Sequence, residues 1–207
     1  MKKYAVWKIL FLFVTFFAVL SSQVRAQSWS ASPTTLSADS FDIYDSDLAV
    51  NASGSAFAVW TAYIDDYGLY ATRYDAVSGL WSTEPELLSD TEVDNSVSPQ
   101  VAIDSSGNAI AVWKQDNGSG YDLYASYFDA VSGKWTTTEE PIDLTAYNVG
   151  NPQVVLDSDG HAFLVWNQCS ASENSTHYQD ILAAIYDVLS ATWTVSPESL
   201  DSSDNDL

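Results

Sequence analysis

Residues 101–113 read VAIDSSGNAIAVW, and the chain repeats this pattern as LAVNASGSAFAVW at 48–60 and as VVLDSDGHAFLVW at 154–166. Each stretch closes on a tryptophan, and these tryptophans are spaced by 53 residues: Trp60, Trp113 and Trp166. A repeat of this length is typical of one supersecondary unit that cannot bury its own faces and stacks on its neighbours. The sequence therefore predicts a repeat architecture.

A second shared block follows each copy and completes the repeat. It reads LYATRYDAVSGLW at 69–81, LYASYFDAVSGKW at 123–135 and ILAAIYDVLSATW at 181–193. In the second repeat the two blocks predict strands at 99–104, 108–115 and 121–130, and a fourth around Trp135. The second of these strands is apolar on both faces, which indicates burial between two layers. We therefore expect an all-β fold of four-stranded antiparallel blades, as in a β-propeller.

Two sets of aspartate or asparagine residues recur where turns are expected. The first set stands three residues before a glycine in each copy and comprises Asn51, Asp104 and Asp157. Such side chains accept hydrogen bonds from backbone N–H groups further along, and the glycine supplies the positive φ that a tight turn needs. The second set, at the end of the third strand, comprises Asp75, Asp129 and Asp187. We interpret both sets as turn residues.

The repeats predict an incomplete ring. A further fourth-strand signature, Trp29 followed by Leu36, precedes the first repeat, so residues 27–207 form one domain with a leading strand. Its repeats are expected at about 47–98, 99–151 and 152–207. Because closed propellers have typically 4–8 blades, three alternatives stay open. The chain is a fragment of a longer protein, or two copies form a six-bladed ring, or the array is open with exposed strand edges.

The first 26 residues have the pattern of a secretory signal peptide. Lysines precede an apolar run of 12 residues from Ile9 to Leu20, and Val24 to Ala26 fits a small-residue cleavage site. The run is shorter than the roughly 20 residues that a membrane-spanning helix needs. We expect a protein that starts at Gln27, has no membrane segment, and is secreted, periplasmic or attached to the cell surface.

Charge and cysteine content restrict the partners and the chemistry. After residue 26 the chain keeps only Arg73, Lys114 and Lys134 against 28 acidic residues, a net charge of −25. This charge argues against nucleic acid and anionic membranes as partners. The single cysteine, Cys169, rules out an internal disulfide, so we expect a packed thiol in a fold that depends on its apolar core.

The pattern Asp-x-x-Gly-Asn-Ala-x-Ala-Val-Trp, which begins at Asp104, resembles propeller-type repeats of secreted or surface bacterial proteins. The turn from Asp104 to Asn108 is similar to that of NHL-like repeats and loosely similar to the Asp-box of sialidase-type propellers. The resemblance covers residues 29–200. It implies a propeller fold and, as for most such domains, a binding or scaffold role, although propellers host many functions.

Residue types point to no catalytic constellation. A sialidase-type carboxylate clamp needs several arginines, but Arg73 is the only one after residue 26. The Gly-x-Ser-x-Gly elbow of serine hydrolases is absent, and two histidines and one cysteine give no zinc spacing. The acidic residues Asp42, Asp45 and Asp47 are interpreted as solvated charge in loops or at strand ends. We assign no catalytic residue and no cofactor.

Two weak candidate sites remain. Asp157 and Asp159 faintly resemble a calcium loop that lacks the alternating oxygen ligands of a full one. The three tryptophans that occupy the same repeat position, Trp60, Trp113 and Trp166, would suit stacking on sugars, but their regular recurrence favours packing between blades. The leading hypothesis is an exported non-enzymatic binding or scaffold module for an unidentified protein or glycan. The alternatives are a fragment of a propeller glycan hydrolase and a carbohydrate-binding lectin.

Overall fold

The structure is a computed structural model. It describes residues 33–37, 42–63, 67–89, 96–118, 120–137, 141–142, 149–169, 178–195 and 200. Its internal contacts divide the chain into residues 1–34 and 35–207. Of the first unit only Pro33 and Thr34 are described, and neither is in regular secondary structure. The expected signal peptide and its cleavage site therefore lie outside the described residues. In the described part no helix is long and apolar enough to cross a membrane.

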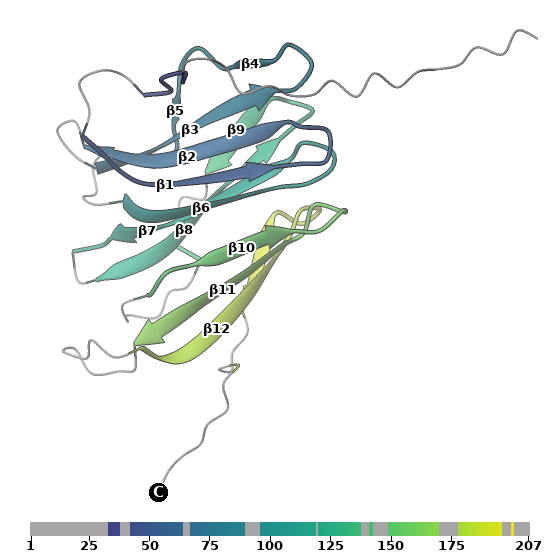
Figure 1. The fold of residues 1–207 in the computed structure, drawn as a ribbon. Helices are drawn as coiled ribbons and strands as arrows, with labels where there is room; N and C mark the ends of the chain where they lie inside the picture. The colour runs from purple at the N-terminus through teal and green to yellow at the C-terminus, as the bar shows by residue number, and fades with distance from the viewer. Residues whose placement is uncertain are drawn as a thin grey trace, which may run out of the picture. The chain divides into compact units, whose positions relative to one another are not determined.

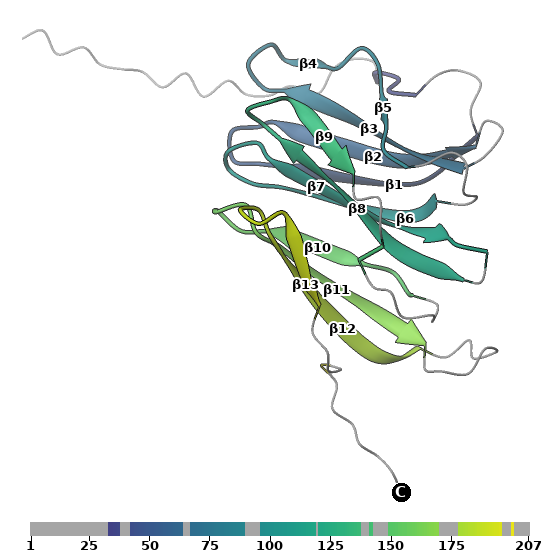
Figure 2. The same cartoon turned by 180° about the vertical axis from the view of Figure 1, so that it is seen from behind.

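The second unit is built of three antiparallel sheets, which we call blades 1, 2 and 3 (Figures 1 and 2). Blade 1 contains β1 (Asp42–Val50), β2 (Ala56–Tyr63), β3 (Tyr67–Asp75), β4 (Leu80–Trp81) and β5 (Glu86–Leu87). Blade 2 contains β6 (Ser96–Ile103), β7 (Ala109–Asp116), β8 (Tyr121–Asp129) and β9 (Lys134–Thr137). Blade 3 contains β10 (Gln153–Leu156), β11 (Ala162–Cys169), β12 (Tyr178–Asp187) and β13 (Thr192–Val195). Consecutive strands pair in chain order, and no helix occurs among the described residues, so the predicted all-β, four-stranded plan is confirmed.

Blade 1 departs from this plan at its outer strand, which is divided into β4 and β5. Both pieces pair with β3. Pro85 lies between them, and a proline has no backbone N–H to donate to a ladder. The strand still ends as the sequence signature predicts. The N–H of Leu88 donates to Leu69 O at 2.8 Å, as the N–H of Ile142 donates to Leu123 O at 2.7 Å.

The blades stack face to face, because each side of a blade is apolar. Alternate residues of a strand point to opposite sides, so each blade has a forward face toward the next blade and a rear face toward the previous one. The buried forward-face residues are Phe57, Val59, Leu69 and Ala71 of blade 1 and Ile110, Val112, Leu123 and Ala125 of blade 2. The rear-face residues that they meet are Ala109, Ala111 and Trp113 of blade 2 and Ala162, Leu164 and Trp166 of blade 3.

Aromatic contacts tie blade 1 to blade 2. The Phe57 ring lies 4.8 Å from the ring of Phe128 and 5.3 Å from that of Trp135, both in edge-to-face geometry. Full burial of such a side chain stabilises a fold by about 1.5–3 kcal/mol. Each blade therefore depends on a neighbour for its stability, as the repeat predicts.

The turn residues act as expected. Asp104 Oδ1 accepts hydrogen bonds from the N–H groups of Ser106 at 2.8 Å and Asn108 at 2.9 Å. Asn51 and Asp157 make the same pair of bonds in their own turns. The glycines of these turns, Gly54, Gly107 and Gly160, have φ values of 89°, 91° and 89°.

The outer turns follow the same logic. Asp129 Oδ1 accepts the N–H of Val131 at 2.9 Å, and Asp75 Oδ1 and Asp187 Oδ1 accept the equivalent N–H groups of Val77 and Leu189. Cys169 is buried and free, so the expected packed thiol is confirmed.

Candidate functional site

The first strand of each blade, β1, β6 or β10, has an irregular pairing with the second strand near the same repeat position. The β1–β2 register shifts between Ile43 and Ser46, and the β6–β7 register shifts between Val97 and Gln100. In blade 3, β10 begins only at Gln153, and an isolated bridge from Val149 to Gln168 precedes it. Such irregularities bend a strand and redirect side chains, and they are frequent beside functional sites.

Prolines explain the break in blades 2 and 3. Pro99 and Pro152 occupy equivalent positions and cannot donate to the neighbouring strand. The residue before Pro99, Ser98, has a φ of 55°, which is the left-handed region that residues with a side chain rarely adopt. Backbone strain of this kind costs about 1–3 kcal/mol and persists where the surrounding structure imposes it.

The redirected residues form the strand-start cluster, which we define as Asp45, Ser98, Lys114 and Asn151. Three of them, Asp45, Ser98 and Asn151, are spaced by 53 residues and come one from each blade. Ser98 Oγ donates to Asn151 Oδ1 at 3.4 Å, and Lys114 Nζ reaches the same oxygen at 3.5 Å. Lys114 is at the end of β7, where the start of blade 2 meets the start of blade 3.

Lys114 is electrostatically unusual. Its side chain is half-buried, and burial lowers the pKa of its ammonium group, while the nearby carboxylate of Asp45 acts in the opposite direction. The ammonium nitrogen also lies 5.3 Å from the ring centroid of Tyr121, which is within cation–π range. A group whose pKa is shifted by burial and by a nearby charge marks a candidate functional site.

Exposed tyrosines stand beside the cluster, and we call Tyr44, Tyr63 and Tyr67 the tyrosine group. The Tyr67 ring centroid lies 5.2 Å from that of Tyr44 and 5.0 Å from that of Tyr63. Tyr44 is 48% exposed and Tyr63 is 41% exposed. A hydrogen bond between the Tyr44 and Tyr67 hydroxyls raises the pKa of Tyr44. Tyr67 also acts electrostatically on Tyr121, whose ring lies beside the Lys114 ammonium group, so the tyrosine group lies near the strand-start cluster.

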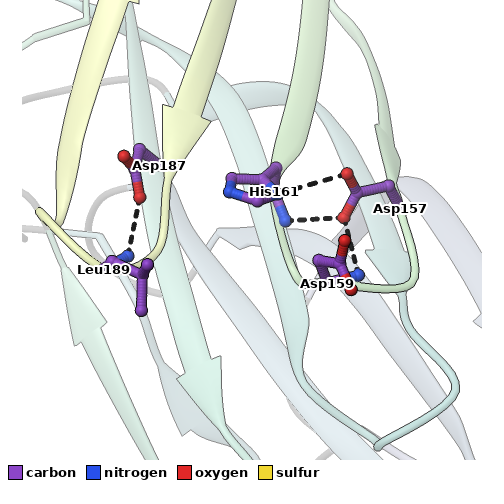
Figure 3. Close-up of polar contacts among 5 residues, drawn as sticks. All are labelled: Asp157, Asp159, His161, Asp187 and Leu189. Carbon is purple, nitrogen blue, oxygen red and sulfur yellow. Dashed lines mark hydrogen bonds and ion pairs between the residues drawn. The ribbon is translucent and has the colours of Figure 1, made fainter.

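The predicted calcium candidates come together at the opposite ends of the strands, in the turn between β10 and β11. Asp157, Asp159 and His161 have potential ligand atoms within 4.8 Å of one another (Figure 3). Asp157 Oδ1 already accepts the N–H groups of Asp159 and His161, and Oδ2 lies 3.2 Å from His161 Nδ1. Burial acts to raise the pKa of Asp157, but these hydrogen bonds outweigh it and lower the pKa. Turn formation accounts for these contacts, and calcium binding there stays a prediction.

The three recurrent tryptophans are buried, and Trp113 and Trp166 lie in the cores between blades. Trp60, Trp113 and Trp166 are 5%, 0% and 1% exposed. A sugar could stack on one of these rings only if the surrounding packing opened. Two of the indole N–H groups are satisfied within their own strand, because Trp113 Nε1 donates to Gln115 Oε1 at 3.0 Å and Trp166 Nε1 to Gln168 Oε1 at 3.3 Å.

Trp60 lacks this arrangement. Its position two residues on is Ala62, and its buried Nε1 has no hydrogen-bond partner. The repeat therefore keeps the tryptophan for packing even where the polar contact is lost.

Sequence reasoning missed three members of the strand-start cluster, and it assigned Asp45 to solvated charge. Asp42 begins strand β1 and Asp45 lies within it, and both are exposed, while Asp47 lies within the same strand and is partly buried. Asp47 Oδ2 accepts the N–H of Val101 at 2.9 Å and so links blade 1 to blade 2. The signal that could have found the cluster is the 53-residue spacing of polar residues just before the most similar block, together with the scarcity of lysine.

Comparison with known proteins identifies the fold and no family. No protein-family model matches the chain, no curated protein matches it, and no NHL-like or Asp-box-like repeat family is identified. A protein of unknown function from Dyadobacter fermentans DSM 18053 has a similar structure, with 12% identity and a TM-score of 0.53 over 75% of this chain and 54% of that one.

Two carbohydrate-active enzymes are also similar in structure. The polysaccharide lyase Uly1 is 11% identical, with a TM-score of 0.50 over 72% of this chain and 39% of that one. The endo-arabinase of Bacteroides thetaiotaomicron VPI-5482 is 15% identical, with a TM-score of 0.45 over 78% of this chain and 61% of that one. The chain thus spans about 39–61% of the length of these three structures. At such identities the likeness shows the fold alone, which is an incomplete β-propeller.

Proposed function

We propose that this chain is an exported glycan-binding propeller module, and that the strand-start cluster and the tyrosine group together form its binding site. One observation carries the proposal. Blades 2 and 3 bring Ser98 and Asn151 together from one repeat position, at the cost of a strained Ser98, beside the half-buried Lys114, on which Asp45 from the same position of blade 1 acts, and near exposed tyrosines. A fold that only needed to pack would gain nothing from this strain.

The chemistry of the site suits a sugar. Sugar hydroxyl groups both donate and accept hydrogen bonds, and Asp45, Ser98 and Asn151 offer acceptors and donors while Lys114 offers an ammonium donor. The apolar faces of a pyranose ring pack on aromatic rings, and the tyrosine group presents two exposed ones. A few placed polar groups next to aromatic surface is the usual composition of a small-molecule site.

The charge of the chain favours neutral glycans. Lys114 is the single cation of the cluster, and it shares the cluster with the carboxylate of Asp45. The surrounding domain carries a net charge of −25, which repels uronates and sulfates over the range of the Debye length. We therefore assign neutral oligosaccharides as the ligand class.

A second candidate function is a part of a larger glycan-degrading enzyme. It is supported by the likeness in fold to the polysaccharide lyase Uly1, of which this chain covers 39%. The two candidates differ in turnover. A binding module leaves the oligosaccharide intact, whereas an enzyme releases shorter products.

The test is isothermal titration of the purified protein with soluble arabino-, xylo-, manno- and gluco-oligosaccharides and with oligogalacturonate. We expect saturable binding of at least one neutral series and none of oligogalacturonate. Lys114→Met should abolish that binding, and Tyr44→Ala should weaken it by up to about tenfold, which corresponds to the loss of one aromatic contact of about 0.5–1.5 kcal/mol.

Lys134→Met is the matched control, because Lys134 is an exposed lysine at the start of β9, near the opposite ends of the strands. It removes the same charge and should leave binding unchanged. Equal losses for both lysine variants, or no binding of any neutral series, would overturn the proposal. Chromatography of the same mixtures for shortened products distinguishes the enzyme candidate.

A further inference from the structure

Blade 3 has a forward face that nothing described covers. The face consists of Val155, Phe163, Val165, Ile181 and Ile185, which are between 40% and 61% exposed. Their equivalents in blade 2 that lie in the core between blades, Ala102, Ile110, Val112 and Leu123, are at most 8% exposed. Leu200 repeats the contrast, with 58% exposure against 4% for its equivalent Leu88. A contiguous apolar surface of this kind marks an interaction site.

The two internal interfaces show what covers such a face. In both interfaces the forward face of one blade packs on the rear face of the next. Between blades 1 and 2, the forward-face residue Phe57 packs beside the aromatic pair Phe128 and Trp135. Between blades 2 and 3, Ile110 is the equivalent of Phe57, and it belongs to the same core cluster as Tyr186 and Trp193 of blade 3, whose rings are in contact. Phe163 is the third member of this series and has no aromatic pair to meet among the described residues.

The chain itself presents the missing aromatic pair at its other end. Tyr74 and Trp81 of blade 1 are equivalent to Phe128 and Trp135, their rings lie 5.4 Å apart, and both side chains are only partly buried. On the same rear face Leu48 and Val50 of β1 are 61% and 64% exposed, whereas Ala56 and Trp60 of β2 are 6% and 5% exposed, so the open part of this face lies along β1. Blades 1 and 3 lie at opposite ends of the stack (Figures 1 and 2), so one chain cannot join these two surfaces to each other.

We propose that the forward face of blade 3 docks on the rear face of blade 1 of a second copy of this chain, and that the reciprocal contact closes a ring of two chains. Phe163 then meets Tyr74 and Trp81 of the second copy as Phe57 meets Phe128 and Trp135. The two three-bladed halves give six blades, which lies in the range of closed propellers. Closure also covers the exposed ends that make an open array prone to aggregation.

This inference does not depend on glycan binding, so its test and the titration above fail separately. Light scattering after size exclusion should give a mass twice that of the chain at micromolar concentration. Phe163→Asp places a charge in both interfaces of the ring and should weaken dimerisation by about 100-fold or more, the equivalent of a lost buried phenylalanine. Val131→Asp, in an outer turn where the side chain is 95% exposed, is the matched control and should remain dimeric.

A covalent test keeps the proposal falsifiable if Phe163→Asp fails to fold. The double variant Phe163→Cys and Tyr74→Cys should be crosslinked between chains by a bifunctional maleimide reagent, because the side chains at the equivalent positions, Phe57 and Phe128, are in ring contact. The single variants should not. A monomeric mass for the unmodified protein, a dimer unaffected by Phe163→Asp, or no crosslink in the double variant would overturn the inference.

Discussion

Asp104 provides a quantitative test of the turn chemistry. Its carboxylate, in a residue that is 4% exposed, accepts the N–H groups of Ser106 and Asn108 and the Nδ2 amide of Asn108 at 2.7 Å. Asp104→Ala removes all three bonds, including both that the buried carboxylate accepts from the backbone of its turn. Hydrogen bonds to charged groups contribute about 1.5–3 kcal/mol each and do not add fully, so we expect the free energy of unfolding to fall by about 3 kcal/mol.

Two comparison variants isolate burial and charge as the cause. Asp157→Ala removes the same pair of backbone bonds from a side chain that is 37% exposed, where water replaces them, and should cost about 1 kcal/mol. Asp104→Asn keeps an acceptor for the backbone, as Asn51 does in blade 1, and should lose less than half as much as Asp104→Ala.

The assay is urea unfolding followed by circular dichroism, with the slope of the transition compared between variants to confirm that the folded state is retained. The carbonyl oxygen of Asp104, which accepts Asn51 Nδ2 at 3.0 Å, is untouched by all three substitutions. If Asp157→Ala destabilised the protein as much as Asp104→Ala, or if Asp104→Asn did, the reasoning from buried charge-assisted bonds would be refuted.

Three further predictions concern stability. Lys114→Met should raise the melting temperature at neutral pH. Burial lowers the pKa of Lys114, which means that the charged ammonium group is less stable in the folded state than in the unfolded state. A lower melting temperature would contradict this. Gln115→Leu leaves the buried Trp113 Nε1 without its acceptor and should cost about 1–3 kcal/mol in urea unfolding, and an unchanged midpoint would be the contrary result. Backbone hydrogen bonds lower the pKa of Asp129 in the folded state. Its carboxylate therefore adds to the free energy of unfolding above the unfolded-state pKa of about 3.9, and this addition is lost as the pH falls through the lower folded-state pKa. Asp129→Asn should accordingly flatten the acid limb of stability against pH, and an unaltered limb would show that the turn carboxylate plays no part.

The repeat predicted the fold because its strongest signals are local. The apolar stretch within 108–115 and its equivalents, with the aspartate or asparagine of each turn and the glycine three residues later, predict strand and turn at the same positions in all three copies. The division of the outer strand of blade 1 into β4 and β5 was not predicted, although Pro85 is visible in the sequence. The second repeat, from which the four-strand pattern was inferred, has no proline at that position.

The candidate site was harder to predict, because it arises from the stacking of blades. Ser98 and Asn151 share a repeat position with Asp45, but the three residue types differ, so no conserved-looking motif draws attention to them. Their convergence requires the broken ladders and the positive φ of Ser98, which periodicity does not report. Lys114 joins them from another strand, and only the packing of blade 2 on blade 3 brings its ammonium group to Asn151.

The most direct test of glycan binding at the strand-start cluster is hydrogen exchange measured with and without the oligosaccharide that binds in titration. We expect added protection at the start of β6 and at residues 149–151, and none at the outer turns 75–79 and 129–133, which lie at the other ends of the strands. Protection confined to those turns, or no change at 96–98 and 149–151 under saturating ligand, would contradict this expectation.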